Sequence, residues 1–153
     1  MMTRFKTAVL FCTLSMGCNN GPKKKPNDKI KDAGLITQEL TSLCFRRVDG
    51  LLGQDTSSIH LVFYVDKVSG DFNHIPHEKD SRKGTIAGTL KGKQVNALWT
   101  FMQEGTTDTL SVEFLLTDRG LLQKTFGIDK QTGRQKLTDT STFTIAYQKI
   151  DCK

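Results

Sequence analysis

The amino-acid sequence predicts an all-β domain in which eight antiparallel strands close into an up-and-down barrel. Short segments of residues 41–153 alternate apolar and polar side chains with the period of two that is typical of half-buried strands. Most of these segments are separated by glycine-containing stretches short enough to form hairpins. Closure would remove the exposed edges of such a sheet. A two-sheet sandwich fits the number of strands nearly as well and is the alternative.

The strand pattern is clearest in residues 59–65. Leu61 and Phe63 fall on the face that we expect to be buried. His60 and Tyr64 fall on the opposite face, as the alternation requires. In chain order, the eight predicted strands are Leu43–Val48, Ile59–Val65, Val68–His74, Thr85–Leu90, Val95–Gln103, Leu110–Leu116, Gly120–Phe126 and Phe143–Tyr147.

Glycines mark the predicted turns and bends between these strands. Gly84, Gly88 and Gly92 recur every four residues, and glycines inside a strand often mark bends where a sheet curls. Residues 35–40 have apolar side chains near helical spacing and predict a short helix before the barrel. The predicted hairpin turns are Ser69–Asp71, Lys91–Lys93, Glu104–Thr106 and Asp118–Gly120, and two longer loops, His74–Lys83 and Gly127–Ser141, are where we expect binding residues.

The composition excludes several classes of protein. With 37% hydrophobic and 25% charged residues among 153, the chain is too apolar to be disordered throughout. It has no run of 18 apolar residues, which excludes a membrane-spanning helix. The net charge of +6 arises mainly in the first 32 residues, because residues 33–153 hold 15 basic and 14 acidic side chains. A nearly neutral body does not favour a nucleic-acid partner.

The first 17 residues have the pattern of a secretory signal peptide. Arg4 and Lys6 form a positive start, and residues 7–16 form a short apolar stretch. Residues 14–18, which read Leu-Ser-Met-Gly-Cys, resemble the lipobox of bacterial lipoproteins. The resemblance implies cleavage before Cys18 and attachment of a lipid to its thiol. An ordinary cleaved signal, with Cys18 incidental, is the alternative.

Residues 18–40 predict a flexible tether between this lipid and a barrel domain of residues 41–153. The segment after Cys18 is rich in lysine, proline and asparagine, which does not form regular structure. Its lysines either contact anionic headgroups or keep the tether soluble. Asn19 follows the cysteine, whereas in enteric lipoproteins an aspartate there retains the protein at the inner membrane. The resemblance therefore implies the outer membrane, with the domain facing the periplasm.

Cys44 and Cys152 flank the predicted barrel and are expected to form a disulfide, the usual state of paired thiols in an oxidising compartment. The bond would place the first and last strands side by side. Two reduced, unrelated thiols are the alternative. We predict no zinc site, because no second cysteine or histidine lies at ligand spacing from either residue.

Several motifs of the barrel resemble those of lipocalin-like envelope lipoproteins of bacteria. The matching motifs lie within residues 44–126 and are Val68–Asp71, Lys79–Asp80, the Gly-Thr-Ile-Ala-Gly run of residues 84–88, and the aromatic strand Trp99–Gly105. The resemblance implies the barrel fold and the envelope location. The resemblance does not indicate any particular activity.

The sequence contains no convincing catalytic or metal-binding constellation. His74 and His77 are three residues apart around Pro76, which favours an exposed loop over a metal site. Glu104 and Glu113 lie on neighbouring predicted strands, and two nearby carboxylates could serve a glycosidase. However, Glu104 is equally well explained as a turn residue, and Glu113 alternates toward the outside of its strand. No nucleophile elbow or phosphate-binding loop is present. We therefore predict a protein that is not an enzyme, with no cofactor and no metal.

The leading functional prediction is a binding module for a small apolar or amphipathic ligand. Small barrels either fill with side chains or hold one small ligand. The candidate lining residues are Tyr64, Trp99, Phe101 and Tyr147, which serve equally well as plain core. The alternative function is a protein-interaction module of the cell envelope, such as a hydrolase inhibitor or an accessory subunit.

Overall fold

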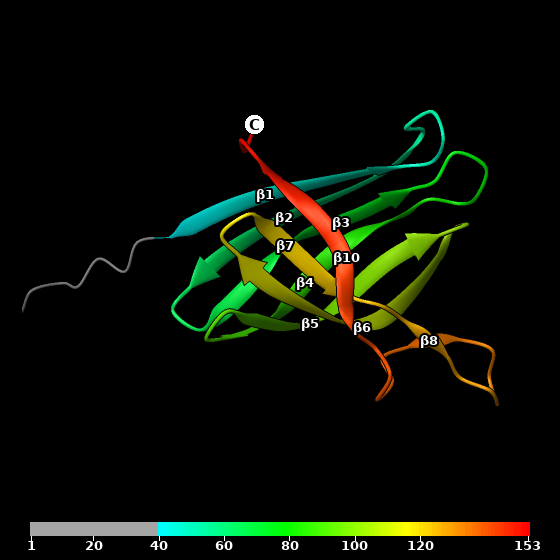
Figure 1. The fold of residues 1–153 in the computed structure, drawn as a ribbon. Coiled ribbons are helices and arrows are strands. Elements are labelled where there is room, and N and C mark those ends of the chain that lie inside the picture. Colours follow the sequence, from blue (N-terminus) through cyan, green and yellow to red (C-terminus); the bar gives the residue numbers. More distant parts are fainter. Residues whose placement is uncertain (1–39) are drawn as a thin grey trace, which may run out of the picture. The chain divides into compact units, whose positions relative to one another are not determined.

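The computed structural model describes residues 40–153, which form an all-β domain (Figure 1). The predicted signal peptide, the lipid attachment at Cys18, the tether and the short helix before the barrel lie outside the described residues, apart from Leu40. Within residues 40–153, nothing resembles a helix long and apolar enough to cross a membrane. The strands are β1 (Thr41–Asp49), β2 (Asp55–Tyr64), β3 (Lys67–Ile75), β4 (Arg82–Lys91), β5 (Gln94–Gln103), β6 (Thr106–Thr117), β7 (Gly120–Lys124), β8 (Gly127–Ile128), β9 (Gln135–Lys136) and β10 (Phe143–Ile150).

Eight of these strands close into an antiparallel barrel in the order β1-β10-β7-β6-β5-β4-β3-β2. From β1 to β7 each strand pairs with the next one in the chain, so the connections are short and the topology is up-and-down. The predicted fold and its eight strands are confirmed, and the sandwich alternative is wrong. The predicted loop at residues 127–141 contains a small extra sheet, the hairpin of β8 and β9.

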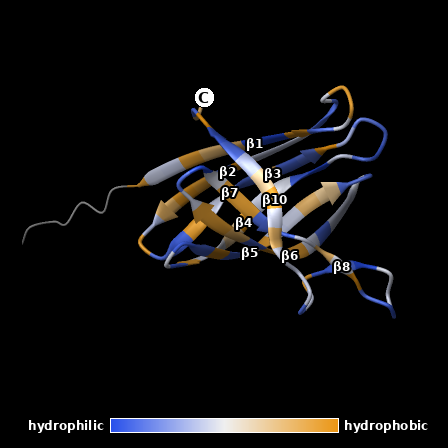
Figure 2. Ribbon diagram, viewed as in Figure 1, coloured by the Kyte–Doolittle hydropathy of each residue, from blue (hydrophilic) through white to orange (hydrophobic). Residues whose placement is uncertain are grey.

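The two ends of the barrel differ. We call the end formed by the β1–β2, β3–β4 and β5–β6 connections the mouth, and the opposite end the base. Apolar side chains alternate inward along the strands and fill the barrel from the base to its middle. The ribbons in Figure 2 accordingly change between hydrophobic and hydrophilic colours along the strands. The buried aromatic members of this core are Phe45, Phe63, Phe72, Trp99, Phe101, Phe114 and Tyr147.

One predicted turn is wrong. Residues 69–71 lie inside β3, and the turn between β2 and β3 is formed instead by Val65 and Asp66. Gly70 serves a close approach between strands rather than a turn, because a Cβ atom at this position would lie 1.8 Å from the carbonyl oxygen of His60. The other three predicted hairpin turns lie between consecutive strands, as expected.

The barrel closes at a short seam between β1 and β10. Only three residue pairs register across it, at Cys44, Phe45 and Arg46 of β1, whereas nine register between β1 and β2. The predicted Cys44–Cys152 disulfide is present at this seam and joins Cα atoms 5.2 Å apart. The bond therefore reinforces the shortest strand pairing of the barrel, at the end where β1 and β10 are paired.

Replacing both Cys44 and Cys152 by serine should lower the free energy of unfolding by about 2–4 kcal/mol, because the bond closes a loop of 108 residues in the unfolded chain. Denaturant titration in the presence of a metal chelator measures the difference. Wild-type protein treated with a reductant is the matched control and should unfold like the double variant. Equal stability of oxidised wild type and double variant would contradict the structural role of the bond.

Candidate ligand site at the barrel mouth

The inward positions of the strands become polar toward the mouth. On β1 the inward sequence runs from Phe45, which is buried, to Arg47 and Asp49. On β2 the inward positions toward the mouth are the buried Ser57 and then Asp55, which lies opposite Asp49 in the strand register. The same change occurs on the neighbouring strands, where the inward polar residues are His74 on β3, Arg82 on β4, Gln103 on β5, Asp108 on β6 and Gln123 on β7.

A cavity of about 240 Å³ lies where this polar layer meets the aromatic core. Its lining combines the polar layer with rings from the core, since Phe72, Trp99 and Tyr147 all contribute. The ring centroids of Phe72 and Trp99 are 4.2 Å apart, and the indole nitrogen of Trp99 donates to the carbonyl oxygen of Phe72 at 3.0 Å. These contacts make the aromatic side of the cavity rigid. The remaining lining residues are Arg47, Asp49, Ser57, His74, Arg82, Gln123, Phe126, Gln135 and Ile145.

Hydrogen bonds fix the polar side of the cavity. The Ser57 hydroxyl lies 2.8 Å from Nδ1 of His74, and the Tyr147 hydroxyl donates to Oε1 of Gln123 at 2.6 Å. Arg47 pairs with Asp49, with a hydrogen bond from Nη2 to Oδ1 of 2.8 Å. No buried polar side-chain atom among residues 40–153 lacks a hydrogen-bond partner.

Arg82 has neutral partners only. Its Nε atom donates to Gln103 Oε1 at 2.7 Å, and its Nη1 atom donates to Gln135 Oε1 at 2.6 Å. The guanidinium also lies 5.2 Å from the centre of the Phe101 ring. None of the ion pairs formed within the described part of the chain includes Arg82. Arg82 therefore forms no ion pair with a carboxylate of these residues, although its charge acts on Asp108, with which it lines a cavity beside the β8–β9 hairpin.

Two titratable side chains of the lining, those of His74 and Tyr147, have shifted pKa values. Burial, and then the positive charge of Arg82, lower the pKa of His74 below its usual value of 6.5. Burial also raises the pKa of the Tyr147 hydroxyl well above its usual value. At neutral pH both side chains are therefore uncharged. The lining itself then carries the positive charges of Arg47 and Arg82 and the negative charge of Asp49, and the charge of Asp55 also acts on His74.

The β8–β9 hairpin lies against the mouth. Arg134, just before β9, forms an ion pair with Asp108 at the start of β6. Together with the bond between Arg82 and Gln135, this contact fastens the hairpin to two barrel strands. A second cavity of about 190 Å³ lies between the hairpin and the barrel, and Phe101 is part of its lining. The two cavities share Arg82 and Gln135, so they adjoin one another.

The barrel wall has a gap on the same side. Beyond Arg46, β1 has no registered partner on β10, and the two strands diverge toward the mouth (Figure 1). A groove of about 570 Å³ runs between them. Arg47 and Asp49 line both this groove and the 240 Å³ cavity. The cavity is thus bordered by the groove in addition to the mouth.

The mouth is rimmed by exposed apolar side chains. Leu51 and Leu52, at the tip of the β1–β2 turn, are almost completely exposed and are flanked by two glycines. The turn is conspicuously hydrophobic in Figure 2. Further exposed apolar residues at this end are Val48, Ile75, Met102 and Ile128.

The structure separates the four aromatic residues proposed from the sequence. Trp99 and Tyr147 line the 240 Å³ cavity, and Phe101 lines the adjoining one. Tyr64 does not take part, because its side chain is 52% exposed on the outside of the barrel. Period-two alternation explains this position, since the preceding residue, Phe63, points inward.

The weaker catalytic candidates are not assembled. Glu104 lies in the β5–β6 turn, whereas Glu113 is nine residues further along β6, or about 30 Å at the rise of a strand. His77 is exposed, and its backbone nitrogen donates to the Asp55 carboxylate. His74 points inward at the mouth instead of sharing a loop with His77.

The polar lining residues escaped the sequence analysis. Arg47, Arg82 and Gln123 attracted no attention because each is an ordinary residue type on a strand. The alternation along the strand could have identified Arg47 as an inward residue, because it continues the series of Leu43 and Phe45.

Comparisons of the chain with models of protein families, with curated proteins and with solved structures found no match.

The lowered pKa of His74 predicts a specific pH dependence of stability. Below about pH 6.5 the unfolded chain binds a proton at this histidine more readily than the folded chain does, so stability falls as the pH falls through that value. His74→Asn removes this contribution while keeping a group that can bond Ser57. Between pH 8 and pH 5 the melting temperature of wild type should therefore drop more than that of the variant. His77→Asn is the control and should behave like wild type, whereas equal drops in wild type and His74→Asn would contradict the assignment.

Proposed function

We propose that the barrel is a non-catalytic binding module for a small amphipathic ligand that carries an anionic group. The observation that carries this proposal is the 240 Å³ cavity, in which stacked rings lie with a positive side chain, Arg82, that forms hydrogen bonds to two glutamines and no ion pair within residues 40–153. The apolar part of the ligand would contact Phe72 and Trp99. Its anionic group would accept charge-assisted hydrogen bonds from Arg82 in place of Gln135.

The size of the cavity favours a compact ligand or one end of a longer one. Sites for drug-sized ligands usually measure about 300–1,000 Å³, and this cavity is slightly smaller. The core fills the barrel below Trp99, so a ligand cannot extend toward the base. A longer tail would leave through the mouth or along the groove between β1 and β10, where the rim residues Leu51 and Leu52 offer apolar surface.

The sole tryptophan of the chain lines the cavity and provides the assay. Titration with octanoate should change the fluorescence of Trp99 in a saturable way. Arg82→Gln should weaken octanoate binding about tenfold or more, because a charge-assisted hydrogen bond is lost. The uncharged analogue octanol should bind wild type and variant alike.

Lys83→Gln is the matched control, since Lys83 is the neighbouring cation on β4 but points outward. It should leave octanoate binding unchanged. Equal effects of Arg82→Gln and Lys83→Gln, or a Trp99 signal that responds to neither probe, would overturn the proposal.

The second candidate function is a protein-interaction module of the cell envelope. The exposed pair Leu51 and Leu52 favours it, because two adjacent leucines held in solvent by a glycine-flanked turn are typical of contact surfaces. This function requires no cavity ligand. It predicts that replacing both Leu51 and Leu52 by serine abolishes capture of an envelope protein and leaves octanoate binding unchanged.

We further propose that the chain is anchored to the outer membrane through a lipid on Cys18, with the barrel facing the periplasm. The support is the signal-like sequence of residues 1–17, the lipobox-like residues before Cys18 and the lipoprotein-like motifs of the barrel. The disulfide at the seam agrees with an oxidising compartment.

Replacing Cys18 by serine should move the protein from the membrane fraction to the soluble fraction, because the site of lipid attachment is lost. Cell fractionation followed by immunoblotting measures the distribution. Cys12→Ser is the control and should remain with the membrane. Continued membrane retention of the Cys18→Ser protein would contradict the lipid anchor.

A further inference from the structure

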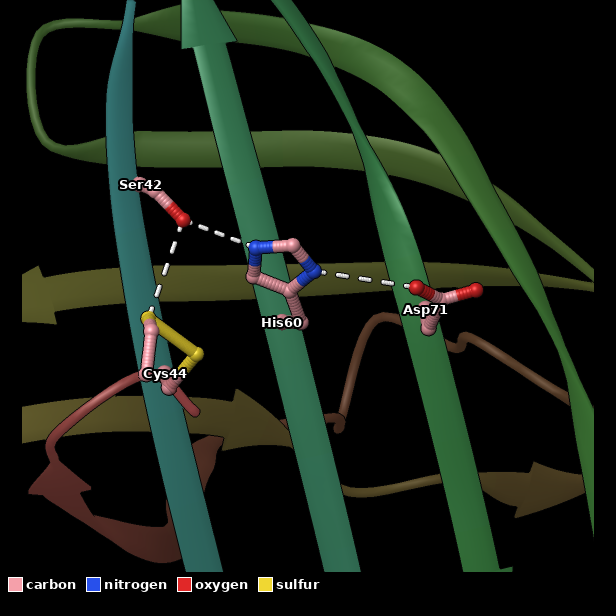
Figure 3. Close-up of a disulfide and its surroundings, with 5 residues drawn as sticks. Ser42, Cys44, His60 and Asp71 are labelled. Atoms are coloured by element: carbon pink, nitrogen blue, oxygen red, sulfur yellow. Dashed lines mark hydrogen bonds and ion pairs between the residues drawn. A yellow bond between two sulfur atoms is a disulfide. The ribbon is translucent and has the colours of Figure 1, made fainter.

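The disulfide lies beside a histidine on the outer face of the barrel. His60 of β2 stands directly opposite Cys44 of β1 in the register of the two strands. One imidazole nitrogen of His60 and the sulfur atoms of Cys44 and Cys152 all lie within 4.8 Å of one another (Figure 3). Two sulfurs and an imidazole at this separation are the donor types that zinc prefers.

The neighbours of His60 hold its ring in a suitable orientation. The Ser42 hydroxyl is 2.8 Å from Nε2 of His60 and 3.7 Å from Sγ of Cys152, so it lies between the imidazole and the sulfurs. Nδ1 of His60 faces the carboxylate of Asp71 on β3 at 3.7 Å (Figure 3). A carboxylate beside one ring nitrogen is typical of metal-binding histidines. The other nitrogen is paired with the Ser42 hydroxyl, which a metal ion would displace.

We propose that reduction of the Cys44–Cys152 bond converts this cluster into a Zn²⁺ site. A dithiol reductant supplies two electrons and two protons, so that it becomes a disulfide and the two cysteines become thiols. Zn²⁺ then displaces both thiol protons and binds the two thiolates together with Nε2 of His60. A water molecule or the Ser42 hydroxyl occupies the fourth position.

The surroundings permit this exchange. Cys152 is exposed and lies two residues beyond the end of β10, so a reductant can reach the bond and the segment can adjust to the ion. Zinc–sulfur and zinc–nitrogen bonds of about 2.3 and 2.0 Å require only a small rearrangement of donors already within 4.8 Å. The ion would link β1 to the segment after β10, as the disulfide does. Zinc would therefore fasten the seam when the bond is reduced.

The test uses the full chain with Cys12 and Cys18 replaced by serine, so that only Cys44 and Cys152 carry thiols. The protein is reduced with a dithiol, freed of reductant without air and titrated with Co²⁺. We expect one ion per chain, with the near-ultraviolet absorption of cobalt–thiolate bonds and the visible absorption of a tetrahedral ion. Zn²⁺ should displace Co²⁺, and the oxidised protein should bind neither.

Three variants distinguish a metal site that includes His60 from metal binding by the two thiols alone. His60→Ala should weaken Co²⁺ binding at least tenfold, and Asp71→Ala should weaken it about 10- to 100-fold by releasing the orientation of the ring. His77→Ala, which removes an exposed histidine of the β3–β4 loop, should have no effect. Absence of binding to the reduced protein, equal binding by the oxidised protein, or unchanged binding by His60→Ala would each overturn the proposal.

Thermal denaturation covers the case in which the reduced chain is unstable. Zn²⁺ should raise the melting temperature of the reduced protein, or restore its fold, because the folded state alone presents all three donors. The gain should disappear in His60→Ala and in the serine variant of Cys44 and Cys152. A reduced chain that gains no stability from Zn²⁺ would overturn the proposal equally well.

Discussion

The pairing of β1 with β10 is the contact on which the barrel depends. Without it the remaining strands form an open meander with two unpaired edges and no enclosed interior. The pairing is short, and the Cys44–Cys152 bond lies at its end next to the base. The same strands part toward the mouth, where the groove borders the cavity. One seam therefore provides both the closure that stabilises the core and the gap beside the candidate site.

The interior of the barrel is divided along its axis. From the base to the middle it is filled by apolar side chains, and around Trp99 the filling gives way to polar side chains and open volume. A filled half makes the scaffold rigid, because close-packed rings leave little freedom. The open half then holds its polar groups at fixed positions, with His74 and Arg82 each bonded to a neighbour. Such preorganisation lowers the cost of ordering a site around a ligand.

The sequence predicted the strands well where their two faces differ and poorly where they do not. At the mouth, β2 begins at Asp55 and β4 at Arg82, several residues before their predicted starts, because Ser57 and Arg82 are polar on the inward face and the alternation disappears. The polar inward residues that line the candidate site are thus the reason why the sequence pattern does not reveal where these strands begin. The disulfide followed from composition and position, whereas the neighbourhood of Cys44 and His60 depends on register between strands, which local spacing does not reveal.

The connectivity of the barrel also has a consequence for how the chain folds. Every pairing from β1 to β7 joins consecutive strands across a short connection, so these contacts cost little loop-closure entropy. The contact between β1 and β10 joins the two ends of the domain and carries the largest such cost. We therefore expect the meander to form first and to curl shut last. We expect Cys44 and Cys152 to be oxidised after closure. The bond would then stabilise a barrel that has already formed and would not direct its assembly.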